Sequence, residues 1–162
     1  MTTVSEAIKK RHSARAFLDK DVDIEIVKNI IEIAKQSPSG VNTQPWNIYV
    51  LSGDARNKLV DEATSRYDQG KMDGQEYLVY PKEMPDWYKE RRRGVGWAMY
   101  GALGIEKGDT EKMMAQGRKN YEFFGAPVGI FVTVKNCVGP NGWGHVGPVS
   151  YTHLRAHETV RN

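Results

Sequence analysis

Helix changes to strand across the stretch Pro38-Ser39-Gly40-Val41-Asn42-Thr43-Gln44-Pro45-Trp46. Before it, residues 24–36 carry apolar side chains at the spacing of a wide buried helical stripe. Asp23 is placed to cap this helix, and Pro38 ends it because proline disfavours helical geometry at the preceding residue. After it, residues 46–51 are rich in aromatic and β-branched residues, which favours a short strand. The stretch is therefore predicted to be a loop that joins a buried helix to a strand.

The segments on either side predict one domain of mixed helices and strands. Further helices are expected where capping or first-turn residues precede helical segments: from Thr3, from Asp54, from Pro85 to Gly104, and from Asp109. Residues 127–134 form an apolar, β-rich run, which we expect to be a strand buried on both faces. This order of elements indicates an α+β fold.

Composition restricts the classes of protein to consider. The chain has 162 residues, of which 40% are hydrophobic and 27% charged, as in an ordinary globular domain. No apolar run approaches the roughly 20 residues of a membrane span, and residues 1–6 do not resemble a secretory signal, so we expect a cytoplasmic protein without a membrane partner. A net charge of +3 is too small to indicate nucleic acid, and the single cysteine excludes a disulfide framework. No metal site is expected.

Arg11-His12-Ser13-Ala14-Arg15 is a candidate anion site near the end of the first predicted helix. If the helix continues through it, Arg11 and Arg15 lie on one side with the Ser13 hydroxyl nearby. Two guanidinium groups and a hydroxyl suit a phosphate monoester, because arginine binds such oxygens through paired hydrogen bonds. The alternative is that these cations only complement the dipole at the helix C-terminus, and spacing alone favours that interpretation.

The loop that starts at Pro38 is a second candidate site. Asn42 and Gln44 each offer a hydrogen-bond donor and an acceptor, as recognition of a flat heteroaromatic ring with carbonyl and N–H edges requires. The alternative is an ordinary turn closed by packing of Pro45 against Trp46. The residues alone leave both interpretations open.

Together these segments resemble the nitroreductase family of FMN enzymes. The motifs that carry the resemblance are Arg11, Ser13, Arg15 and Phe17; Pro38, Ser39, Asn42, Gln44, Pro45 and Trp46; Phe123-Phe124-Gly125-Ala126-Pro127; and Gly142-Trp143-Gly144-His145-Val146-Gly147. The resemblance implies a nitroreductase-like α+β fold over residues 1–147, with helices flanking a central sheet that is incomplete in this chain.

The resemblance also implies a cofactor, a partner and a reaction. By the family pattern, Arg11, His12, Ser13 and Arg15 hold the phosphate and ribityl chain of FMN. Contacts to the flavin from the partner subunit of a homodimer come from Pro38, Ser39 and Asn42, to which we add Gln44. NADH or NADPH reduces the flavin, and a nitroaromatic, quinone or related acceptor is reduced next, in a ping-pong sequence. The flavin carries this chemistry, so no catalytic side chain is assigned.

The resemblance stops at about Gly147. Residues 148–162 are polar with little helical stripe, and we interpret them as a non-native or artefactual tail on a truncated chain. The alternative function is therefore a catalytically inactive truncated fragment with weak or no FMN binding. Arg91-Arg92-Arg93 could bind a nucleotide phosphate, although a solvated helix face explains these arginines better. A small basic nucleic-acid binder that uses the same arginines is a third hypothesis.

Overall fold

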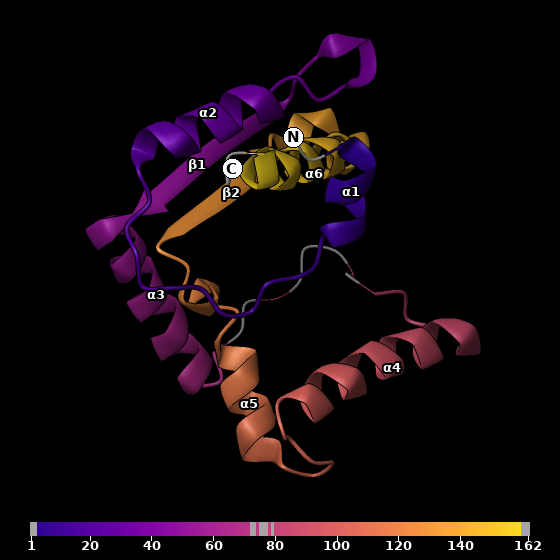
Figure 1. Cartoon of the computed structure of the whole chain (residues 1–162). Coiled ribbons are helices and arrows are strands. Elements are labelled where there is room, and N and C mark those ends of the chain that lie inside the picture. The colour runs from indigo at the N-terminus through magenta and orange to yellow at the C-terminus, as the bar shows by residue number, and fades with distance from the viewer. Residues whose placement is uncertain (1–2, 72–73, 75–77, 79, 160–162) are drawn as a thin grey trace. The chain divides into compact units, whose positions relative to one another are not determined.

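A computed structural model describes residues 3–71, 74, 78 and 80–159 of the chain (Figure 1). The chain divides into two units. The first comprises Met1–Asn57 and Gly125–Asn162, and the second comprises Lys58–Phe124. Both candidate sites lie in the first unit.

The α+β class and the positions of both predicted strands are confirmed. The elements along the chain are α1 (Val4–Lys10), α2 (Ile24–Ala34), η1 (Gly40–Asn42), β1 (Trp46–Ser52), α3 (Gly53–Asp68), α4 (Asp86–Ala102), α5 (Thr110–Arg118), η2 (Phe123–Gly125), β2 (Val128–Val134), η3 (Asn136–Val138) and α6 (Asn141–Thr159). Within the described residues the sheet has two strands, β1 and β2, and they pair antiparallel.

Side-chain caps fix where three of the helices begin. At α1, the Thr3 hydroxyl accepts from the Glu6 N–H at 3.3 Å, and the Glu6 carboxylate accepts from the Thr3 N–H at 2.7 Å. This second bond, followed by the bond from the Thr3 hydroxyl, lowers the pKa of Glu6. Asp23 caps α2 and Asp109 caps α5, as predicted. The prediction for Asp54 is wrong: α3 already begins at Gly53, and the Asp54 carboxylate instead lies in the first turn, where the helix dipole favours a negative charge.

One face of the sheet is covered by α6. Trp46 lies opposite Val134 in the antiparallel register, and Ile48 and Val50 share this half-buried face. A Cβ atom on Gly142 would come within 3.0 Å of Val134 Cγ2, so α6 approaches the sheet at a residue that has no side chain. Glycine therefore sets the distance between α6 and β2.

The other face of the sheet is open. Tyr49 and Phe131 lie opposite one another and are 57% and 41% exposed. The expectation that residues 127–134 are buried on both faces is wrong for this chain. The two strands are antiparallel, and exposure alternates along β2 because only one face of such a sheet is packed against a helix.

Helix α2 packs against α6, and this contact forms the core of the first unit. The buried residues of α2 are Val27, Ile30 and Ala34. Val149 of α6 is only 1% exposed, and the Ser37 hydroxyl donates to the Pro148 carbonyl at 3.3 Å. The predicted stripe on α2 is wider than the face that α6 covers, since its outer isoleucines remain partly exposed. Helix α6 runs through Gly147 into the segment interpreted as a tail, and whether residues 148–162 are native stays a prediction.

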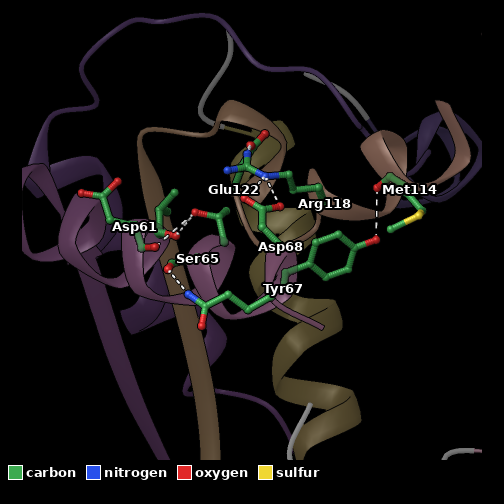
Figure 2. Close-up of polar contacts among 10 residues, drawn as sticks. Asp61, Ser65, Tyr67, Asp68, Met114, Arg118 and Glu122 are labelled. Carbon is green, nitrogen blue, oxygen red and sulfur yellow. Dashed lines mark hydrogen bonds and ion pairs between the residues drawn. The ribbon is translucent and has the colours of Figure 1, made fainter. Parts of the chain in front are cut away.

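In the second unit, hydrogen bonds join α3 to α5 and to the residues just after it (Figure 2), and a ring contact adds to them. Arg118 Nε donates to Asp68 Oδ1 at 2.9 Å, and the same guanidinium pairs with Glu122. The Asp68 bond is the main cause of a raised pKa at Arg118. The Tyr67 hydroxyl donates to the Met114 carbonyl at 3.1 Å, and its ring lies 5.0 Å from that of Tyr121. These contacts hold α5 against the end of α3.

Truncation of Val149 tests the packing of α6. We expect Val149→Ala to lower the free energy of unfolding by about 2 kcal/mol, because it removes buried methyl groups and leaves a cavity. Chemical denaturation of the full chain measures this. The matched control is Val95→Ala on α4, where the side chain is 70% exposed and we expect little change. Equal stability of the two variants would contradict the packing described and would favour a tail that does not belong to the fold.

Candidate functional site

The segment Arg11–Arg15 is not helical, so the condition under which Arg11 and Arg15 would share one side of a helix is not met. Helix α1 ends at Lys10, and Arg11 is its C-cap with ψ of 126°. Residues 11–20 are all exposed in the structure, so a longer helix would bury nothing there, and short helices without packing are marginal in water. Figure 1 shows the chain drawn out between α1 and α2.

All four predicted site residues of this segment are exposed: Arg11, His12, Ser13 and Arg15. His12 Nδ1 lies 3.2 Å from the Lys10 carbonyl oxygen, which orients the ring beside the end of α1. The described residues include no carboxylate within ion-pair distance of Arg11 or Arg15. The segment therefore presents cations and a hydroxyl to solvent with their hydrogen-bonding capacity largely unused.

The loop after α2 is tied together by its own hydrogen bonds. Ser39 Oγ accepts from the Gln44 N–H at 2.9 Å, and the Thr43 hydroxyl donates to the Gly40 carbonyl at 3.1 Å. The Gly40 N–H donates to His145 Nδ1 at 3.5 Å, which links the loop to α6. Three bonds over so short a segment hold it in one conformation.

This loop is strained. Its non-glycine residues Val41, Asn42 and Gln44 have φ of 45°, 56° and 45°, in the left-handed region. Asparagine tolerates this region, but a β-branched residue there is unusual and costs about 1–2 kcal/mol. Val41 is also 96% exposed, so burial of its side chain does not compensate within the chain. Strained, exposed loops of this kind are characteristic of binding sites.

The structure does not bring the two predicted sets of site residues together. Pro38, Asn42 and Gln44 are exposed and Ser39 is half-buried. In the part of the chain that the structure describes, no hydrogen bond or ion pair links residues 38–44 to residues 11–15. Their assignment to one cofactor site stays a prediction.

Sequence reasoning missed His145. Its ring lies against the loop, since a Cβ on Gly40 would come 3.2 Å from His145 Cε1. The two residues lie far apart in the chain, and nothing in the local sequence of either predicts the contact. Among the described residues, no group of three or more His, Cys, Asp or Glu side chains could hold a metal ion.

In the part of the chain that the structure describes, no helix is both long enough and apolar enough to span a bilayer.

Known proteins resemble the chain in sequence. The family model described as "Nitroreductase family" matches residues 8–156. The chain is 39% identical over 132 residues to the 4-nitrobenzoate reductase of Nocardioides sp. (strain LMS-CY), covering 78% of this chain and 53% of that protein. It is 35% identical over 133 residues to the nitrobenzene nitroreductase of Ectopseudomonas oleovorans, covering 81% and 58%. The chain thus spans little more than half the length of these curated relatives.

Solved structures resemble the chain in fold. An FMN and NADPH-dependent nitroreductase NfnB from "sphigopyxis sp. strain HMH" superposes with a TM-score of 0.88 at 36% identity, covering 95% of this chain and 70% of that one. The FMN-dependent nitroreductase NfnB from Mycobacterium smegmatis, in complex with NADPH, superposes with a TM-score of 0.89 at 27% identity, covering 96% and 70%. The predicted nitroreductase-like fold is confirmed.

Replacement of Val41 tests the strain in the loop. We expect Val41→Gly to raise the free energy of unfolding by up to about 1 kcal/mol, because glycine adopts a positive φ without the clash of a β-branched residue. The same change at the exposed helical position Val95 should lower the free energy of unfolding by roughly half a kcal/mol, since glycine is a poorer helix former than valine. Thermal or urea unfolding of both variants measures whether each change raises or lowers the free energy of unfolding. Destabilisation at Val41 would show that its conformation is not strained.

Proposed function

This chain belongs to the nitroreductase family, and we propose that it acts as an FMN-dependent oxidoreductase. In this proposal NADH or NADPH is the electron donor, and a nitroaromatic, quinone or related compound is the acceptor, in a ping-pong sequence. The single observation that carries the proposal is the rigid, strained loop of residues 39–44, which exposes the amide groups of Asn42 and Gln44. Similar proteins include reductases named for nitrobenzene and 4-nitrobenzoate.

The exposed segment Arg11–Arg15 fits the phosphate end of FMN. Arg11, Ser13 and Arg15 occur at alternate positions, and alternate side chains of a drawn-out backbone point to the same side. This periodicity allows the two guanidinium groups and the hydroxyl to clamp one phosphate without a helix. Arginine binds phosphate oxygens through two parallel hydrogen bonds, so each guanidinium also orients the group that it holds. His12 contributes a further ring nitrogen beside this clamp.

The loop fits the ring end of FMN. The Asn42 and Gln44 side chains supply donors and acceptors for carbonyl and N–H edges, and Pro38 offers a flat apolar surface. Ser39 acts differently, because its hydroxyl already accepts the Gln44 N–H and thereby holds the loop. The chemistry that bound FMN would supply is uptake of a hydride and transfer of electrons to the second substrate. The residues of this chain bind and orient it, and none of the assigned residues is a general acid or base.

A homodimer is part of the proposal. Since no hydrogen bond or ion pair among the described residues joins residues 11–15 to residues 38–44, a complete site is more readily built from one segment of each of two chains. The exposed Tyr49 on the sheet and the partly exposed isoleucines of α2 give apolar surface that a second copy can bury.

The second candidate function is an inactive form with weak or no FMN binding. The partly exposed isoleucines of α2 favour it, because apolar surface that stays uncovered promotes non-native association. If residues 148–162 are a non-native tail, this second candidate function is the expected one. The experiment below separates the two candidates.

Flavin content and its dependence on Arg15 test the proposed function. We expect the purified chain to be yellow and to bleach when NADH or NADPH is added without oxygen. Arg15→Gln should weaken FMN binding by about tenfold or more and leave riboflavin binding unchanged, because only FMN carries the phosphate. Flavin fluorescence titration measures both. Lys9→Gln, an exposed cation of α1 outside the motif, is the matched control. A folded, colourless chain that takes up no FMN would establish the inactive alternative.

Complementation between two variants tests the shared site. Asn42→Ala should weaken FMN and riboflavin binding alike, because it removes a contact to the ring. When Arg15→Gln and Asn42→Ala chains are unfolded together and refolded as an equal mixture, mixed dimers each hold one unaltered site. About a quarter of all sites then regain FMN binding if the two segments come from different subunits. No recovery in a mixture that forms dimers would place both segments in one chain.

A further inference from the structure

A basic pocket lies in the second unit between the segment 80–84 and α4. It has a volume of about 440 Å³, and its lining includes Tyr80, Lys82, Met84, Lys89, Arg92 and Arg93. Four of these side chains are cationic, and none of the described lining residues is acidic. The basic pocket is formed by residues of the second unit, whereas both candidate flavin-binding segments belong to the first unit.

Contacts in the basic pocket position its charges. The Arg92 guanidinium stacks on the Tyr80 ring, with its carbon 4.4 Å from the ring centroid. Stacking leaves the N–H groups at the edge of a guanidinium free for an oxyanion. Lys89 pairs with Asp86 at 3.0 Å, and Asp86 does not line the pocket. For Lys82 and Arg93, no carboxylate among the described residues lies within ion-pair distance.

All three consecutive arginines of α4 are exposed, but they differ in what they contact. Arg91 lies over the Trp87 ring at 5.2 Å, whereas Arg92 and Arg93 line the basic pocket. Lys82 reaches the same pocket from outside α4. Convergence of cations from two segments on one cavity raises the local positive potential, and a bound anion relieves it.

We infer that the basic pocket binds a dianionic phosphate group of a nucleotide. Several cations around one cavity match a dianion better than a single carboxylate. The volume lies in the range of small-molecule sites, and Tyr80 and Met84 supply apolar surface for an attached sugar or base. The inference deepens the proposed function and rests on it for the identity of the nucleotide: the 2′-phosphate of NADPH, which NADH lacks.

Calorimetric titration of the full chain with NADP⁺, NAD⁺ and inorganic phosphate tests the inference. We expect NADP⁺ to bind at least about tenfold more tightly than NAD⁺, and inorganic phosphate to compete with it. Arg93→Gln and Lys82→Gln should each remove most of this preference. Arg91→Gln is the matched control, because it deletes an adjacent arginine outside the basic pocket and should keep the preference. The preference should also weaken with added salt.

Each remaining outcome overturns the inference or part of it. Equal affinity for NADP⁺ and NAD⁺ without competition by phosphate would exclude a phosphate site. Competition by phosphate together with equal affinity would keep a phosphate site and overturn its assignment to NADPH. If Arg91→Gln and Arg93→Gln lose the preference for NADP⁺ equally, the positive charge of the whole helix surface causes the preference and the basic pocket does not. Circular dichroism checks that the variants fold, and Lys82→Gln gives a second variant that leaves the Tyr80 stacking in place.

The two proposals fail in different ways. Binding of NADP⁺ is measured without turnover and does not need bound flavin. A colourless chain that still prefers NADP⁺ would overturn the proposed function and leave the basic pocket supported. A yellow chain that bleaches equally with NADH and NADPH, and binds NAD⁺ and NADP⁺ equally, would support the proposed function. It would overturn the assignment of the basic pocket to NADPH.

Discussion

The packing of α6 against α2 and the sheet is the constraint on which the first unit depends. Helix α6 covers Val27, Ile30 and Ala34 of α2 with one side and the Val134 face of the sheet with another. Gly142 permits the close approach to the sheet, and Val149 fills the buried side of the helix. The same helix carries His145, whose Nδ1 accepts a hydrogen bond from the Gly40 N–H. One packing arrangement therefore fixes both the core and the loop that we assign to flavin binding.

Local sequence predicted those elements whose cause is local. Asp23, Thr3 and Asp109 cap helices as expected because an N-cap bond spans only two or three residues. The strand over residues 128–134 follows from its β-branched composition. Its exposure did not follow, because it depends on which face a distant helix covers. Local sequence also left open whether α1 continues beyond Lys10, since the helical spacing of Arg11 and Arg15 says nothing about whether packing supports a further turn.

The candidate site shows the same division. The amide side chains of Asn42 and Gln44 mark the loop from sequence, but the strain at Val41 and the bond from Gln44 to Ser39 could be seen only in three dimensions. The contact of Gly40 with His145 joins segments that no local pattern relates. In the basic pocket, sequence showed a run of arginines, and the structure separated Arg91 from Arg92 and Arg93 by what each side chain contacts.

The pairing of β1 with β2 has a consequence for how this chain meets other chains. Within the described residues, both strands are edge strands, so along one side of each the backbone N–H and C=O groups face away from the other strand. Such an edge is a template on which a further extended segment can hydrogen-bond. At high concentration we therefore expect backbone pairing between the strand edges of different molecules. A charged or proline residue at an outward-facing position of β1 would oppose that pairing without touching the face that α6 covers.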